Sequence, residues 1–252
     1  MKQEFYERLV SDALDLAGCM MRCGAEVRNV EKTIERICTA YGAVRCDVFA
    51  LSLSVFATIR FPGHSPVNCS RRIAKAGTSL NQLEEYNDLS RYVCRERPKP
   101  EYIEKRMAEI EVNCGRKWWY ILGYIIGAGA FTAFVGGDWR DCVIAAVIGA
   151  FIFFCDEYLK RNGMNKLIYT LLMCAVTGCL AIFSVRWGLG KNPDKIMIGD
   201  IMLFIPTLTL CNAVKDMLYG DIFTGVYYFI DAVLITFMIA LGFYISEALV
   251  GV

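Results

Sequence analysis

The sequence IMIGDIMLFIPTLTLCNAVKDMLYGDIFTGVYYFIDAVLITFMIALGFYI, residues 196–245, decides the fold of this chain. It consists of two apolar runs that are joined by the polar stretch 215–221. Each run has about 20 residues, which is the length that a helix needs to cross about 30 Å of hydrocarbon. The stretch therefore predicts a hairpin of two membrane-spanning helices.

Both runs carry polar groups that hydrocarbon disfavours. The first run contains Asp200, Pro206 and Asn212, and the second places Asp231 close to the expected middle of the membrane. An acid at that depth costs about 2.5–3.5 kcal/mol on insertion scales, whereas each Leu, Ile, Phe or Val returns about 0.3–0.6 kcal/mol. The second run has enough apolar residues to insert in spite of this cost. Insertion does not explain the acid, so an ionisable group inside the membrane indicates a functional site.

Composition divides the chain into two halves. Hydrophobic residues make up 56% of the chain and the net charge is +1. Residues 1–117 hold 19 Lys and Arg against 16 Asp and Glu, and residues 118–252 hold 8 against 10. A soluble amphipathic half followed by a membrane half fits this distribution. The near-zero net charge gives no concentrated basic face, so we expect no nucleic-acid partner.

Cysteine is abundant, but its spacing does not suggest a metal site. The chain has 12 cysteines, no Cys-x-x-Cys pair and a single histidine, His64. Zinc sites need Cys and His clustered at short spacings. We therefore expect no metal and no cofactor, and we interpret the cysteines as small buried hydrophobic residues.

Residues 1–115 predict a small α/β domain. Apolar residues recur at helical spacing in four segments, and β-forming residues replace that pattern between the second and the third. The pattern predicts about three strands and four helices. The predicted helices are 4–23, 27–41, a segment from 78 onward and 101–112, and the predicted strands lie within 46–61 and at 67–73.

Residues 116–252 predict an all-α membrane domain of five transmembrane helices. The predicted segments are 118–136, 140–158, 167–187, 196–214 and 222–246.

Small residues indicate where the helices of this bundle approach each other. The pattern occurs as Gly123-x-x-x-Gly127 in the first segment and as Ala145-x-x-x-Gly149 in the second. Small residues at this spacing let two helix backbones come close together. We therefore expect a contact at each of these two pairs.

The charges around the segments predict the orientation in the membrane. The N-terminus carries acids throughout and lacks the apolar region of a signal peptide. Basic residues are also more numerous in the loops on the N-terminal side of the bundle, because Arg116, Lys117, Lys160, Arg161, Lys166 and Lys215 fall there. We expect a multi-pass protein of the cell (inner) membrane, surrounded by the lipid bilayer, with a cytoplasmic N-terminus.

Two stretches of the chain resemble the threonine/serine exporter family. Residues 21–47 contain a Gly-Ala-Glu, a helix of the Val-Arg-x-Val-Glu type and a glycine before a strand. Residues 204–242 are similar to the family's repeat signature, although Thr207 stands where a glycine is expected after the proline. The matching elements of that signature are Pro206, Asn212-Ala213, Asp216, Gly220-Asp221, Gly225 and Asp231.

The resemblance implies a function and a partner. It implies that the chain is not an enzyme and that it exports a small hydroxy amino acid, threonine or serine. Full-length members carry ten membrane helices, so a chain with five resembles the split form. That form works in an oligomer with a separately encoded small membrane subunit. Members of the split type also handle small dicarboxylates such as succinate, and this alternative stays open.

Polar residues of the hairpin predict the substrate site. Thr209, Asn212 and Asp216 share one helix face, and a second polar face lies on the following helix. If the two helices are antiparallel neighbours, the faces line one cavity, and a helix broken at a proline builds such sites in transporters. Asp231 is the expected proton or substrate-amine partner, because its own segment lacks a basic residue. The predicted binding residues are Asp231, Asn212, Pro206, Thr209, Asp216, Asp200, Thr224 and Tyr228.

Two alternatives remain for these residues and for the soluble half. Asn212 and Asp216 would equally well cap the hairpin near the cytosolic interface. The rival function is a membrane-anchored sensor or hydrolase that acts through the cytosolic domain, with Glu26, Arg28 and Glu31 as its candidate groups. A helix surface or an interdomain contact accounts for these charges more simply. We therefore predict no catalytic residues.

Overall fold

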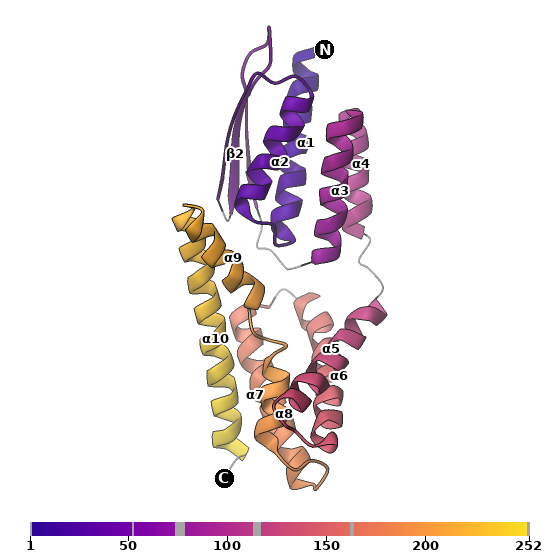
Figure 1. Cartoon of the computed structure of the whole chain (residues 1–252), viewed down its shortest axis with the longest axis vertical. Helices are drawn as coiled ribbons and strands as arrows, with labels where there is room; N and C mark the ends of the chain where they lie inside the picture. Colours follow the sequence, from indigo (N-terminus) through magenta and orange to yellow (C-terminus); the bar gives the residue numbers. More distant parts are fainter. Residues whose placement is uncertain (1, 52, 74–78, 113–116, 162–163, 251–252) are drawn as a thin grey trace. The chain divides into compact units, whose positions relative to one another are not determined.

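The computed structural model describes residues 2–51, 53–73, 79–112, 117–161 and 164–250. The chain forms two compact units (Figure 1). The first unit consists of Met1–Gly115 and Cys211–Tyr228, and the second consists of Arg116–Leu210 and Phe229–Val252. Arg116, on which the orientation prediction partly rests, lies outside the described residues. Assignment of the units to cytosol and membrane stays a prediction.

The first unit contains the predicted three strands and four helices. They follow one another as α1 (Lys2–Arg22), α2 (Val27–Ala40), β1 (Arg45–Leu51), β2 (Ser54–Arg60), β3 (Val67–Arg72), α3 (Leu80–Glu96) and α4 (Pro100–Val112). The strands form an antiparallel sheet of order β1-β2-β3, in which Leu51 pairs with Ser54 and Ile59 with Val67. The expectation of an α/β domain is confirmed to this extent.

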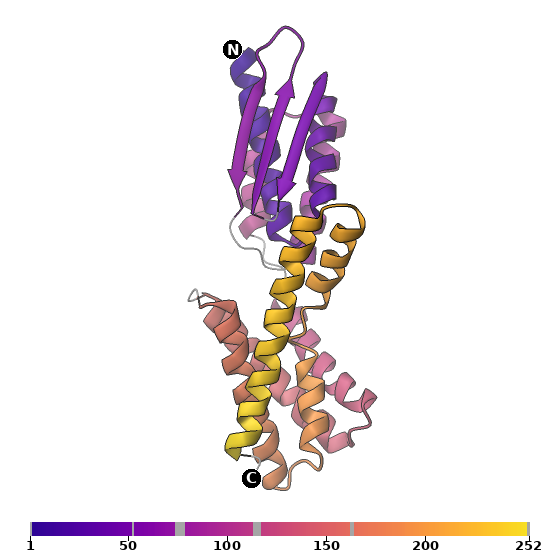
Figure 2. The same cartoon turned by 90° about the vertical axis from the view of Figure 1, so that its left-hand side faces the viewer.

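One face of the sheet packs on helices and forms the core of this unit. Val55, Ala57 and Ile59 of β2 are buried, and the residues between them are exposed, as the two-residue period of a strand requires. α1 packs against β3 and α2 packs against β1. Figure 2 shows the three strands in front of these helices. The amphipathic helices thus bury their apolar stripes against the sheet.

Asp12 of α1 is an ionisable residue inside this core. It is 3% exposed, and its Oδ2 atom has no hydrogen-bond partner among the described residues. Burial, followed by the charges of Glu104 and Asp15, raises the pKa of Asp12 to about 7. The folded chain therefore holds a proton on Asp12 at pH values where the unfolded chain has released it.

This proton makes stability depend on pH. Because the folded pKa lies above the unfolded value of 3.8, stability falls as the pH rises from about 4 to about 7. An Asp12→Asn chain should gain about 1–2 kcal/mol at pH 8, since the amide stays neutral but is still buried. It should gain little at pH 5. Thermal unfolding of the whole chain in detergent at both values checks this, with the exposed Asp88→Asn as control; equal gains at both values would contradict it.

The second unit contains four helices and the larger part of a fifth. These are α5 (Lys117–Phe134), α6 (Trp139–Arg161), α7 (Lys166–Arg186), α8 (Pro193–Ile201) and, from Phe229, the helix α10 (Ile222–Val250). Within the described residues, α7 and α10 have the length and apolar composition to cross a membrane. α5 offers a shorter apolar stretch, Trp118–Phe134. The five-helix membrane domain therefore stays a prediction.

The segment 196–214 is divided into two helices, at the break that its proline indicated. α8 ends at Ile201, and α9 (Thr207–Leu218) begins after a non-helical stretch. Pro206 has no N–H to donate and forces the preceding residue into an extended conformation, so a continuous helix is disfavoured there. The N–H of Phe204 instead bonds to the carbonyl of Ile201, three residues back, at 2.9 Å. The chain thus breaks over residues 202–206.

Small residues do mark one of the two expected helix contacts. A Cβ atom on Gly149 would lie 2.7 Å from the carbonyl oxygen of Tyr124, so only glycine lets α6 approach α5 this closely. Ala145, one turn earlier, is also buried. Gly123 has no atom within 4 Å of a Cβ built on it among the described residues. The prediction is right for the Ala145/Gly149 pair and wrong for Gly123.

Candidate functional site

The predicted binding residues are divided between the two units, so each group is described by itself. The second unit holds those around the helix break together with one acid of α10, namely Asp200, Pro206, Thr209 and Asp231. The first unit holds those around the turn between α9 and α10, namely Asn212, Asp216, Thr224 and Tyr228. The single cavity expected from both helix faces stays a prediction.

Asp200 is the most completely buried acid of the second unit's predicted set. It is 0% exposed, and both of its carboxylate oxygens lack a hydrogen-bond partner among the described residues. It is buried because α8 packs against α5, α6 and α7. α8 ends at the next residue, Ile201, where the chain breaks. A carboxylate in such surroundings is costly unless it takes up a proton or meets a cation.

Asp231 has a cationic neighbour that the sequence did not indicate. The Nζ atom of Lys166, at the start of α7, lies 3.8 Å from its Oδ2 atom. α7 and α10 run parallel, because Gly242 packs further along against Leu171 and Cys174. Asp231 is therefore level with the first turn of α7, and its depth in the membrane stays a prediction. The missing partner comes from another helix, far away in sequence.

Pro206 and Thr209 lie at the start of α9. Pro206 closes the break, and its carbonyl oxygen accepts the N–H of Leu210 at 3.0 Å. Both residues are half-buried. Thr209 follows the first turn of α9, on the side of the break opposite to Asp200 in the chain.

In the first unit, the end of α9 contacts the segment between α1 and α2. The side-chain amide of Asn212 donates to the carbonyl oxygen of Gly24 at 3.3 Å. The Nζ atom of Lys215 lies 2.9 Å from the Oε1 atom of Glu26, which precedes α2. These bonds form what we call the hinge contact, completed by the guanidinium of Arg28, which lies 4.8 Å from the ring centre of Tyr219.

Asp216 is buried beside the hinge contact. It is 2% exposed, and its Oδ2 atom has no hydrogen-bond partner within the described part of the chain. Burial, then the charges of Asp221 and Glu26, raise the pKa of Asp216 to about 6, against the opposing effect of Lys215. This carboxyl can therefore exchange a proton near neutral pH.

A tight turn makes α9 and α10 antiparallel neighbours. Gly220 has a φ of 95°, a conformation that glycine adopts without strain, and the N–H of Asp221 bonds back to the carbonyl of Asp216 at 2.9 Å. A Cβ on Gly225 of α10 would lie 2.8 Å from the carbonyl oxygen of Ala213. Thr224, beside this contact, is 2% exposed, and Tyr228 is half-buried.

The structure gives the charged residues of α2 positioning roles. Glu26 and Arg28 belong to the hinge contact, which lies within the first unit. Glu31 accepts the N–H of Ala50 at 2.8 Å and so holds α2 to β1, and burial raises the pKa of this carboxyl. His64 packs against the ring of Tyr6 at 4.9 Å between ring centres. The residues of the hinge contact lie in the two stretches that resemble the family, 21–47 and 204–242.

Comparison with known proteins identifies one family. A family model described as "Putative threonine/serine exporter" matches residues 13–250. The threonine/serine exporter of Corynebacterium glutamicum is 23% identical over 94% of this chain and 51% of its own length. The probable threonine/serine exporter of Mycobacterium tuberculosis is 24% identical over 96% of this chain and 46% of its own length.

A third relative is shorter. The probable succinate transporter subunit YjjP of Klebsiella aerogenes is 21% identical over 92% of this chain and 90% of its own length. The chain thus spans about half the length of the two exporters and most of this subunit. No solved structure matches the chain.

Proposed function

The chain belongs to the threonine/serine exporter family, and from this premise we propose that it is one subunit of a secondary transporter that exports small polar metabolites, with threonine or serine as substrate. Family membership implies a location in the membrane. Exit of the substrate is coupled to protons, and a second, separately encoded small membrane protein of the same family completes the transporter.

The observation that carries this proposal is the burial of Asp200 without a hydrogen-bond partner in the part of the chain that the structure describes. Its carboxylate lies next to a broken helix, and broken helices expose backbone groups that bind substrates and ions in secondary transporters. A buried acid that lacks a protein partner is suited to bind a proton and an ammonium group in turn. Asp231 has Lys166 beside it, so we assign it the secondary role of opening and closing this end of the unit.

The charge of Asp200 favours an amino acid over a dicarboxylate. A substrate ammonium would compensate the buried carboxylate, whereas a second acid beside it would be repelled. Lys166, a cation of the second unit, is engaged with Asp231. These charges support threonine or serine as the first choice.

Succinate is the second candidate substrate, and chain length favours it. This chain covers 90% of the relative that is named as a probable succinate transporter subunit. The relatives named as threonine/serine exporters are about twice as long as this chain. The word subunit in that name also supports a two-component transporter. A dicarboxylate would require Lys166 to exchange its contact with Asp231 for one with the substrate.

Efflux from cells decides between these possibilities. Cells are preloaded with labelled threonine, serine or succinate, and loss of label is followed with this chain alone, with its small membrane partner, and with the partner alone. We expect faster loss of threonine and serine only when both proteins are present. Loss of succinate alone would establish the second candidate. No efflux of any substrate from cells that insert both proteins would overturn the proposed function.

A further inference from the structure

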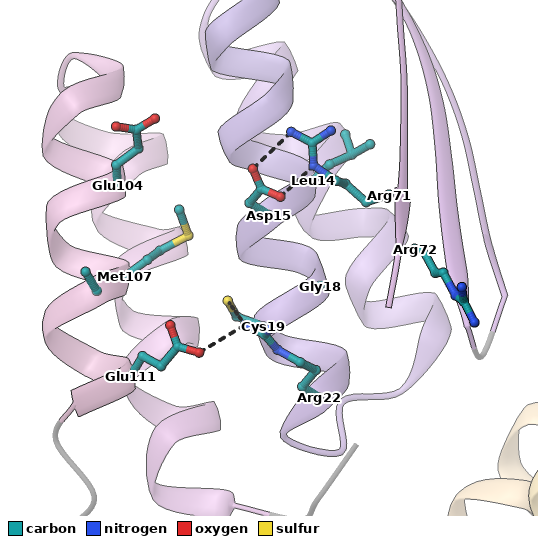
Figure 3. Close-up of a pocket in the computed structure, with 11 residues that line it drawn as sticks. Leu14, Asp15, Gly18, Cys19, Arg22, Arg71, Arg72, Glu104, Met107 and Glu111 are labelled. Carbon is teal, nitrogen blue, oxygen red and sulfur yellow. Dashed lines mark hydrogen bonds and ion pairs between the residues drawn. The ribbon is translucent and has the colours of Figure 1, made fainter. Parts of the chain in front are cut away.

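A groove in the first unit lies between α1, α4 and the end of β3 (Figure 3). Its volume is about 340 Å³, which is at the small end of the range for ligand sites. α1 contributes Asp15, Gly18 and Arg22 to its lining, and α4 contributes Glu104, Met107 and Glu111. The groove therefore combines acids, a cation and an apolar thioether within the reach of one small molecule.

One wall of the groove is fixed by an ion pair. The guanidinium of Arg71, on β3, donates to both carboxylate oxygens of Asp15, at 2.7 and 3.2 Å. It also donates to the hydroxyl of Ser11 at 2.5 Å. This bidentate geometry holds Arg71 and Asp15 to each other and leaves neither charge for a ligand.

The opposite end of the groove holds Arg22, a cation that can bind a ligand. Arg22 lies 3.6 Å from Glu111, and their side chains are 42% and 66% exposed. An ion pair this exposed contributes little to stability, so Arg22 can exchange Glu111 for another carboxylate at small cost. Figure 3 shows Arg22 and Glu111 reaching toward each other from α1 and α4.

Glu104 supplies a negative charge to the groove and lies close to a buried acid of α1. Asp12 lies one turn before Asp15 on α1, and its buried Oδ2 atom has no hydrogen-bond partner in the described chain. The charges that act on it most strongly belong to Glu104 and Asp15, both of which line the groove. An ammonium group bound in the groove would compensate the charge of Glu104.

We propose that the groove binds a free α-amino acid, with its ammonium group at Glu104 and its carboxylate at Arg22. Met107 supplies the apolar surface for the side chain. The inference deepens the proposed function and rests on it: the cytosolic domain measures the concentration of the amino acid that the membrane domain exports. A dicarboxylate would meet the acids of α4 and is excluded from the groove.

Calorimetric titration of the whole chain in detergent with threonine, and separately with succinate, tests the inference. We expect threonine to bind and succinate to give no heat. Glu104→Gln and Arg22→Gln should each weaken threonine binding about tenfold or more, since each removes a charged hydrogen bond worth about 1.5–3 kcal/mol. Glu84→Gln on α3 and Arg8→Gln on α1, which do not line the groove, are the matched controls and should bind as the unaltered chain does.

A third variant separates the groove from the transport site. Asp200→Asn should keep the groove's binding of threonine, even if its export is lost. Threonine binding that disappears in Asp200→Asn, or that survives when Asp200→Asn is combined with Glu104→Gln or Arg22→Gln, would overturn the inference and leave the proposed function standing. If the unaltered chain does not bind threonine, the inference about the groove is also overturned. The efflux assay tests the proposed function separately.

Discussion

Cells that carry Asp200→Asn together with the partner subunit should export threonine about 30- to 100-fold more slowly than cells with the unaltered chain. The substitution removes a charged interaction with the substrate ammonium that is worth about 2–3 kcal/mol. It also removes the group that exchanges a proton during the cycle. Asparagine has nearly the same size, so packing of α8 against α5, α6 and α7 should be retained. Initial rates of efflux of labelled threonine, normalised to protein in the membrane, measure the effect.

The matched control for this variant lies on the same helix. Asp194, in the first turn of α8, is exposed, and Asp194→Asn should export at the normal rate. The export rate of Asp231→Asn should lie between those of the other two variants, because the charge of Asp231 is partly compensated by Lys166. Normal export by Asp200→Asn would show that Asp200 does not take part in transport. Complete loss of export in Asp231→Asn alone would show that Asp231 is the acid that binds the proton and the substrate.

Reversing one charge of the hinge contact should slow export severalfold, and reversing both should restore it. Glu26→Lys places two cations where Glu26 and Lys215 now lie 2.9 Å apart. Lys215→Glu should be the more harmful change, because it gathers a third acid beside Asp216 and Asp221. The double variant Glu26→Lys, Lys215→Glu recreates an ion pair of opposite sense. The efflux assay measures all three variants.

Recovery in the double variant distinguishes a contact from two separate surface effects. Reversal of Arg8 in the exposed pair with Glu4 on α1 serves as the control and should leave export unchanged. If the double variant is no better than the worse single variant, the hinge contact does not position the turn between α9 and α10 for transport.

Periodicity alone was sufficient to predict most elements of the first unit. Helices such as α2 carry their apolar residues on one stripe, and β2 alternates strictly, so the local pattern specifies which face is buried. The break in the fourth predicted segment was harder to place. Pro206 indicated a break at one residue, but the chain leaves the helix already after Ile201, because a proline also constrains the residues before it.

The candidate site shows what a single sequence leaves undetermined. Asp231 was favoured because its own segment has no basic residue, yet Lys166 of another helix lies beside it. Glu26 and Lys215 are also far apart in the chain and meet in the first unit. Pairings of this kind depend on tertiary packing, which periodicity does not encode. The burial of Asp200 likewise follows from three helices packed around α8.

Transport by proteoliposomes that contain only this chain and its small membrane partner tests the central claim most directly. The vesicles are loaded with labelled threonine and a pH-sensitive dye, and a proton gradient is imposed. We predict that threonine leaves as protons enter, and that Asp200→Asn abolishes both movements while Asp194→Asn preserves them. Two results would contradict the claim that the buried acid of α8 couples protons to export. One is a rate of threonine exit that does not depend on the proton gradient, and the other is an unchanged rate in Asp200→Asn.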